Sequence, residues 1–289
     1  MPVFKKLKNG RSKDKENKSG KSLVSFILSI VAAYFIAAFA ILIFQRAYIY
    51  YPTENQVSDP AQYGADYISY VTSDGLEITS WYCAAKENRP VIMMFHGNGG
   101  NISHRSNKQA FFCSRGYGFL LAEYRGYGGN EGAPSESGLY KDARAALGWL
   151  KEQQVNMKDV VIYGESIGTG VAMQMALEYP ATKAVVLEAP FTGLRNVAKD
   201  VMPWFSPFSY FIRDTYDNLS KVEALNMPLL ILHGDKDNII PARHSEILYS
   251  RAKSENSHLT MLKGGNHNDL TDFGLLENIQ DFLERLSEG

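Results

Sequence analysis

Short runs of Val, Ile, Leu, Met and Phe recur along the chain, and glycine, histidine or aspartate follows closely after most of them. Continuous apolar runs that end at such residues are typical of strands that are buried on both faces of a sheet. We therefore expect buried strands at residues 91–95, 119–124, 160–163, 184–187 and 229–232, and a further strand at 258–262.

Helical stretches separate these strands, and the expected helices cover residues 103–115, 138–153, 167–179 and 242–254. Strands that alternate with helices predict a parallel, doubly wound α/β sheet. Residues 66–71 and 76–84, which flank the turn Ser73-Asp74-Gly75, are typical of an antiparallel hairpin at the edge of such a sheet.

Residues 22–45 contain 24 consecutive uncharged positions that are rich in Leu, Ile, Val, Phe and Ala. A helix of this length is long enough to cross roughly 30 Å of hydrocarbon, so we expect a transmembrane anchor here. The alternative is a cleaved signal peptide, because Ala38-Phe39-Ala40 resembles a cleavage site. The apolar run continues through residues 41–44, which favours an uncleaved anchor.

Residues 1–21 form a basic tail with eight Lys or Arg and two Asp or Glu. Basic residues before a membrane helix favour a cytoplasmic N-terminus. We therefore expect a single-pass membrane protein whose remaining chain lies on the non-cytoplasmic side, periplasmic or extracellular in a bacterium and lumenal in a eukaryote. Arg46, Tyr48, Tyr50 and Tyr51 suit the outer membrane interface.

The rest of the chain, residues 22–289, carries 22 basic and 29 acidic side chains. This negative balance argues against a nucleic-acid partner, which requires a positive surface. The hydrophobic share of 45% excludes a wholly disordered chain. Cys83 and Cys113, thirty residues apart, form neither a disulfide framework nor a zinc ribbon, and we expect both to fill core space.

A candidate nucleophile lies in Gly164-Glu165-Ser166-Ile167-Gly168, between an expected strand and an expected helix. This is the setting that a G-x-S-x-G nucleophile elbow requires, because the serine occupies a strained turn that leaves no room for side chains on both sides. The helix behind Ser166 directs unpaired N–H groups toward the place where negative charge develops.

In this architecture an acid and then a histidine follow the serine along the chain. We assign His267 as general base and Asp237 as the carboxylate that orients its imidazole, with Asp235 as the rival acid. Of the other histidines, we expect surface positions for three and packing or turn roles for two: His104, His244 and His258, and then His96 and His233.

A glycine-rich loop, His96-Gly97-Asn98-Gly99-Gly100-Asn101, follows the strand at 91–95. Its position matches the loop that donates the second oxyanion N–H, so we expect the backbone amides of Asn98 and Ile167 to form the oxyanion hole. Neither a phosphate-binding glycine motif nor a metal-binding cluster of Cys and His is found, so the sequence implies no cofactor and no metal.

Taken with Tyr124-Arg125-Gly126-Tyr127-Gly128, these motifs resemble those of the alpha/beta-hydrolase superfamily, and more narrowly of its membrane-anchored, serine aminopeptidase-like members. The resemblance covers residues 50–289 and implies an alpha/beta-hydrolase fold with a mostly parallel sheet of about eight strands. Because the group includes depalmitoylases and lysophospholipases, it implies hydrolysis of acyl esters or thioesters without a cofactor. Gly99 departs from the pattern, since relatives often carry alanine there.

Residues 191–225 interrupt the alternation of strands and helices and contain many aromatic side chains. We expect a small lid that binds an acyl chain through Trp204, Phe205 and Phe208. The alternative is a helical cap that packs only on its own core.

Two other function classes remain open on the sequence. A serine peptidase would use the same machinery. A catalytically dead scaffold or adhesion protein would use the same fold, although such proteins usually lack a member of the triad. No obligate protein partner is implied, so the expected partners are an acyl substrate and the lipid bilayer.

Overall fold

The computed structural model describes residues 4–53 and 58–288, with side chains at 21–53 and 58–287. The chain divides into two compact units, 1–45 and 46–289. The first unit contains α1 (Phe4–Ile43). Within the described residues, Lys21–Ile43 is the stretch of helix long and apolar enough to cross a membrane. The side chains of the basic tail at residues 1–20 lie outside the described part of the chain.

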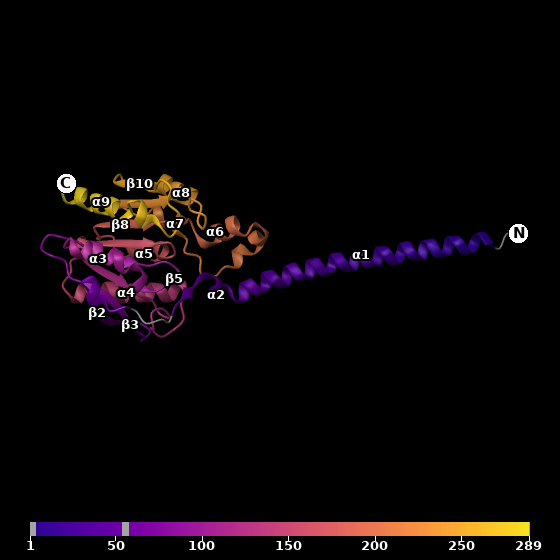
Figure 1. The fold of residues 1–289 in the computed structure, drawn as a ribbon, viewed down its shortest axis with the longest axis horizontal. Helices are drawn as coiled ribbons and strands as arrows, with labels where there is room; N and C mark the ends of the chain where they lie inside the picture. The colour runs from indigo at the N-terminus through magenta and orange to yellow at the C-terminus, as the bar shows by residue number, and fades with distance from the viewer. Residues whose placement is uncertain (1–3, 54–57, 289) are drawn as a thin grey trace. The chain divides into compact units, whose positions relative to one another are not determined.

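The second unit is built on one eight-stranded sheet with the order β10-β9-β8-β7-β4-β6-β3-β2. Figure 1 labels β10 and β8 toward one side of this sheet and β3 and β2 toward the other. The pairs β2 with β3 and β3 with β6 are antiparallel, and every other pair in this sheet is parallel. The expected mostly parallel, doubly wound sheet is therefore confirmed. Its strands are β2 (Asp66–Val71), β3 (Glu77–Cys83), β4 (Val91–Phe95), β6 (Gly118–Ala122), β7 (Val160–Glu165), β8 (Ala184–Glu188), β9 (Leu229–Gly234) and β10 (Ser257–Leu262).

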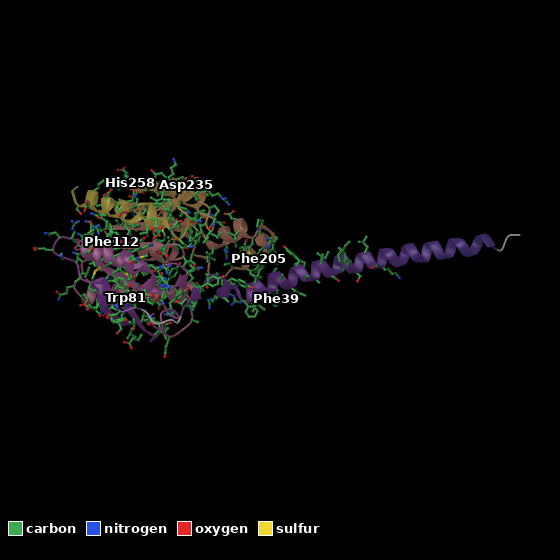
Figure 2. All side chains as sticks on the ribbon, viewed as in Figure 1. Phe39, Trp81, Phe112, Phe205, Asp235 and His258 are labelled. Carbon is green, nitrogen blue, oxygen red and sulfur yellow. A yellow bond between two sulfur atoms is a disulfide. The ribbon has the colours of Figure 1, made fainter. Side chains whose placement is uncertain are left out.

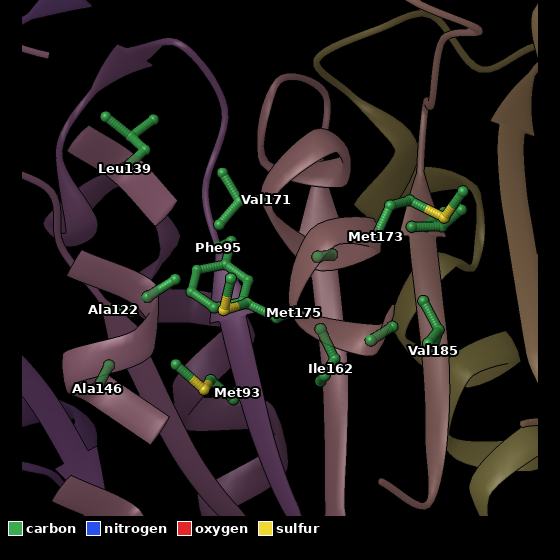
Figure 3. Packing of buried hydrophobic residues seen from close by; sticks show 14 of the residues in the cluster. Met93, Phe95, Ala122, Leu139, Ala146, Ile162, Val171, Met173, Met175 and Val185 are labelled. Atoms are coloured by element: carbon green, nitrogen blue, oxygen red, sulfur yellow. The ribbon is translucent and has the colours of Figure 1, made fainter. Parts of the chain in front are cut away.

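Alternate residues of a strand point to opposite faces of the sheet, so the apolar strands present two apolar faces, and helices cover both of them. Met93 and Phe95 belong to a cluster that includes residues of α4 (Glu136–Glu152), α5 (Gly168–Glu178) and α8 (Arg243–Arg251), and the close view of this cluster shows residues of α4 and α5 (Figure 3). Ile92 and Met94 belong to the opposite cluster with α3 (Ser106–Ser114) and α9 (Leu275–Glu288). Strands buried on both faces explain why their apolar runs are continuous rather than alternating.

The observed elements differ from the expected ones mainly at their ends. The strand expected at 119–124 runs from Gly118 to Ala122, and the first turn of the helix expected at 103–115 is a separate 3₁₀ helix. The C-terminal helix α9 was not expected, although its buried positions Leu275, Ile279 and Phe282 recur at helical spacing. The 3₁₀ helices outside the cap are η1 (Pro60–Tyr63), η2 (Ile102–Arg105), η3 (Met157–Asp159) and η5 (Leu270–Phe273).

Cys83 and Cys113 form a disulfide between β3 and α3, with a Cα–Cα distance of 6.3 Å. Both cysteines lie at a core cluster, as expected, but they are bonded to each other instead of only filling space there. Disulfide frameworks are recognised in a sequence from several cysteines at characteristic spacings. Two cysteines 30 residues apart give no such signal, so the sequence did not indicate that they pair.

The insertion between β8 and β9, residues 191–225, forms a cap of three short helices, α6 (Leu194–Val201), η4 (Pro203–Phe211) and α7 (Asn218–Val222). Phe205, which is labelled in Figure 2, lies in this cap and is buried. Its ring packs against those of Trp204 and Phe208. The cap thus has a small aromatic centre of its own.

Residues 46–53, which we call the connecting segment, include most of α2 (Gln45–Ile49) and β1 (Tyr51–Pro52). β1 pairs in parallel with β5 (Gly99–Gly100), in the loop that follows β4. The second unit therefore starts a few residues before the expected boundary at residue 50.

Candidate active site

Ser166 lies in a sharp turn between β7 and α5, with a φ of 51°. A side chain at either flanking glycine would collide with backbone: a Cβ at Gly164 would lie 2.5 Å from the carbonyl oxygen of Gly168, and one at Gly168 would lie 2.1 Å from that of Phe95. The Ser166 N–H donates to the Glu188 carbonyl at 2.8 Å, which attaches the turn to β8. The strained conformation is thus held by close packing on both sides.

The loop after β10 brings His267 to this turn. The His267 Nε2 lies 3.0 Å from the Ser166 Oγ, and its Nδ1 lies 2.7 Å from the Asp237 Oδ2. The Asp237 side chain is fully buried and that of His267 is 9% exposed. The three residues that the sequence analysis selected therefore form a continuous hydrogen-bonded chain, although 101 positions separate serine and histidine.

Several donors surround the Asp237 carboxylate. Its Oδ1 accepts the N–H groups of Ile239 and Ile240, both at 2.8 Å, and the His233 Nε2 lies 3.1 Å from its Oδ2. Burial raises the pKa of Asp237, but the hydrogen bonds from His233 and His267 outweigh it and hold the pKa below its ordinary value. The rival Asp235 is exposed and accepts the Gly264 N–H instead.

The loop after β4 lies against the serine turn, since a Cβ at Gly97 would lie 3.5 Å from that of Ser166. Within the described part of the chain, the backbone N–H groups of Asn98 and Ile167 have no acceptor. Ile167 also precedes the first residue of α5, where the helix dipole favours negative charge. Both amides are thus available to an oxyanion.

The connecting segment holds this loop from the other side. The Asn98 backbone carbonyl accepts the Tyr51 N–H at 2.9 Å and the Tyr127 hydroxyl at 2.8 Å, while the side-chain Nδ2 of Asn98 donates to the Ile49 carbonyl at 3.0 Å. The conformation of the loop therefore depends on residues that immediately follow the apolar helix.

A buried ionic cluster lies beneath the serine turn and was not expected from the sequence. The Arg105 Nη2 lies 2.5 Å from the Glu165 Oε1, and the Lys108 Nζ lies 2.7 Å from the Glu165 Oε2 and 2.5 Å from the Glu188 Oε2. None of the four side chains is more than 14% exposed. The cluster also reaches the loop after β4, where the Gly97 N–H donates to Glu165 at 3.3 Å.

Two positive and two negative charges balance within this cluster. Burial raises the pKa of Glu165, but Arg105 and Lys108 outweigh it and hold the pKa well below its usual range. Burial lowers the pKa of Lys108, and the two carboxylates raise it above its ordinary value. A sequence signal existed at Glu188, a charged residue at the end of a fully buried strand.

The remaining histidines have structural contacts. His96 is buried with its Nε2 2.6 Å from Glu123, and His233 contacts Ser245 through its Nδ1 at 2.6 Å. The expected surface position of His244 is wrong: its ring is buried in α8, and burial lowers its pKa. Among the described residues, no three His, Cys, Asp or Glu side chains are grouped in a way that would hold a metal ion.

The three aromatic residues expected to bind substrate have different environments. Phe205 is 1% exposed, Phe208 is half-buried, and Trp204 is 46% exposed. All three lie in η4 of the cap.

Comparison with known families gives a match to the family described as "Serine aminopeptidase, S33", over residues 86–219 and 208–273. An uncharacterized protein of Mycobacterium tuberculosis is 34% identical over 269 residues, covering 89% of this chain and 94% of that protein. Protein bem46 of Schizosaccharomyces pombe is 30% identical, and the matched region covers 91% of this chain and 96% of that protein. The alpha/beta hydrolase domain-containing protein WAV2 of Arabidopsis thaliana is 29% identical, and the matched region covers 81% of this chain and 85% of that protein.

Among solved structures, the esterase Pf2001 of Pyrococcus furiosus matches with a TM-score of 0.68 and 18% identity, covering 82% of this chain and 98% of that one. An esterase from Exiguobacterium antarcticum matches with a TM-score of 0.60 and 16% identity, covering 75% and 98%. At these identities the matches establish the fold.

Proposed function

The chain belongs to the serine aminopeptidase S33 family of alpha/beta hydrolases, and from that premise we propose that it is a membrane-anchored serine hydrolase. Its substrates are carboxylic esters or thioesters of acyl groups, such as lipid esters, lysophospholipids or acylated proteins. The observation that carries the proposal is the chain of contacts from the Ser166 Oγ through His267 to the buried Asp237.

The proposed reaction passes through an acyl-enzyme. Ser166 attacks the acyl carbonyl while the His267 Nε2 accepts the hydroxyl proton and then transfers it to the leaving group. The Asn98 and Ile167 amides stabilise the negative charge that develops on the carbonyl oxygen. Water, activated by His267, then releases the acyl group and restores the serine.

Asp237 has two functions in this scheme. Its carboxylate orients the imidazole, with the His267 Nδ1–H donating to it, and it stabilises the imidazolium that forms during proton transfer. The lowered pKa of Asp237 keeps it ionised at neutral pH, as both functions require. The donors on its other oxygen, Ile239 and Ile240, prevent the carboxylate from rotating away.

The proposed topology has a cytoplasmic N-terminus, a span within Lys21–Ile43 and the hydrolase unit on the non-cytoplasmic side. Eight basic residues before the span favour this orientation. The disulfide between Cys83 and Cys113 supports it independently, because disulfides persist in oxidising compartments and are rare in the cytosol.

The proposal is tested with a fluorophosphonate probe, which reacts with activated serines. We expect the full-length chain in detergent to be labelled and the Ser166→Ala variant to remain folded but unlabelled. Ser250→Ala, which removes an exposed hydroxyl on α8, is the matched control and should be labelled normally. Labelling that persists in Ser166→Ala would place the nucleophile elsewhere.

The substrate class requires a separate assay. A chain-length series of p-nitrophenyl esters, acyl thioesters and lysophospholipids should show turnover that depends on Ser166. The description of the matched family favours one other candidate, an aminopeptidase with the same triad. Release of N-terminal residues from a peptide panel, with no turnover of acyl esters, would establish that alternative.

A further inference from the structure

The cap exposes a concentrated apolar surface, which we call the cap patch: Val201, Trp204, Tyr210 and Phe211. Their side chains are 59%, 46%, 73% and 61% exposed. These four large residues fall within an eleven-residue segment that also contains the exposed Pro203 and Pro207. Single exposed apolar residues are normal on a protein surface, but several large ones close together in the chain are not. Such a group is typical of an interaction site.

The cap contacts the connecting segment, which begins three residues after the predicted membrane span. The Arg46 Nε lies 3.0 Å from the Asp214 Oδ2, and the Tyr50 hydroxyl donates to the same oxygen at 3.1 Å. Asp214 is three residues beyond Phe211, and Arg46 is three residues beyond Ile43, where the span ends. Three residues of chain reach at most about 10 Å, so the end of the proposed span stays within about that distance of Arg46, which contacts Asp214 of the cap.

The charges around the cap patch suit an anionic membrane surface. Residues 194–214 together with Arg46 carry four basic and two acidic side chains, whereas the chain from residue 22 onward carries 22 basic and 29 acidic ones. The Arg195 guanidinium lies 5.0 Å from the centre of the Tyr210 ring, so a cation and an aromatic face occur together. Aromatic and basic side chains of this kind are typical of the lipid headgroup region.

We propose that the cap patch inserts into the headgroup region of the bilayer that holds the anchor, with anionic lipids as its partner. The hydrolase unit is then attached to the membrane at two places, through the helix and through the cap. The inference rests on the anchoring part of the proposed function and not on its chemistry. It assigns the exposed side of the cap to lipid.

Spin labels on single introduced cysteines test this arrangement in the full-length chain, reconstituted in nanodiscs of phosphatidylcholine and phosphatidylglycerol. Labelling is selective because both cysteines of the chain are in the disulfide. Phe211→Cys reports on the cap patch, and Ile36→Cys reports on the span. Val71→Cys, an equally exposed aliphatic residue on the edge strand β2, is the matched control.

We expect labels at 36 and 211 to be relaxed by oxygen and protected from a water-soluble nickel chelate, and the label at 71 to show the reverse. A lipid-exposed label at 36 with a label at 211 as accessible to the chelate as that at 71 would overturn the inference and leave the anchor intact. A water-exposed label at 36 would overturn both. Dipolar broadening between labels at 211 would show that a second copy covers the cap patch instead.

The lipid charge is tested in the same experiment. In nanodiscs that contain only phosphatidylcholine, the label at 211 should be more accessible to the nickel chelate, while the label at 36 should not change. Equal accessibility at 211 in the two lipids would overturn the assignment of anionic lipid as the partner.

Discussion

Replacing Glu165 by glutamine tests whether the ionic cluster beneath the serine turn stabilises the fold. The substitution keeps the volume of the side chain and removes one of two negative charges. Lys108 then keeps its contact with Glu188, whereas Arg105 loses the carboxylate that it contacts, so one positive charge stays buried without compensation. Breaking a buried pair in this way costs about 3–5 kcal/mol of folding free energy, because the remaining charge has lost its solvent as well as its partner.

The matched control is Glu178→Gln, the same chemical change in the exposed pair between Arg144 and Glu178. This pair is bidentate, with both distances 2.7 Å, and its side chains are 43% and 27% exposed. Exposed pairs contribute about 0.2–1 kcal/mol. The two variants therefore differ in the burial of the carboxylate and in the number of cations that it contacts, while both lose a close bidentate pair with arginine.

Urea unfolding of residues 46–289, the compact unit that contains the whole sheet and both core clusters, measures the difference. The unfolding free energy of a domain of this size falls by about 3 kcal/mol per molar urea. The urea concentration at the midpoint of unfolding should therefore fall by about 1–1.7 M for Glu165→Gln and by no more than about 0.3 M for Glu178→Gln. Equal shifts for the two variants would refute the reasoning that burial makes the cluster important.

The pH dependence gives a second check on the same variant. The pKa of Glu165 is depressed in the folded state, so its contribution to stability is complete above the unfolded value of about 4.3 and is lost as the pH falls below it. The difference in unfolding free energy between the parent and Glu165→Gln should therefore be constant from pH 7 to about pH 5 and shrink below about pH 4. A difference that grows in acid would contradict the assigned sign.

Three further predictions concern other parts of the second unit. Replacing Cys83 and Cys113 by serine should lower the unfolding free energy by about 3–4 kcal/mol, from the entropy of a 30-residue loop, and non-reducing mass spectrometry should show the bond in the parent. Gly168→Ala should prevent folding, because its Cβ would lie 2.1 Å from a carbonyl oxygen of β4, whereas Gly148→Ala, with open space around it in α4, should raise the melting temperature. Asn98→Ala should reduce kcat/KM on the order of 10-fold in ester assays while costing only about 1 kcal/mol of stability, since it removes one hydrogen bond to the connecting segment; an unchanged kcat/KM would show that this bond does not position the loop.

The sheet and the positions of the three candidate catalytic residues could be predicted because each depends on local signals. Ser166, Asp237 and His267 all follow the ends of apolar runs, and the carboxyl ends of parallel strands meet at one edge of a sheet. The choice between Asp237 and Asp235 depended on a single bend, and the structure shows which carboxylate meets the imidazole.

The ionic cluster and the disulfide could not be predicted in the same way. Lys108 is 57 and 80 residues from its two carboxylates, and nothing in the local pattern pairs residues at those separations. The same reason applies to His244, whose burial depends on Thr192 and on the path of the cap rather than on α8 alone. The C-terminal helix α9 did carry a local signal in its apolar spacing.

The positive φ of Ser166 restricts which amino acids can serve as nucleophile at this position. Threonine carries the same hydroxyl group, yet its second branch at Cβ clashes with the backbone in the left-handed region. Cysteine has no such branch and fits the same turn. The fold therefore accepts a cysteine thiol as the nucleophile at residue 166 but excludes the secondary alcohol of threonine. A search for variants with altered reactivity at this position should begin with cysteine.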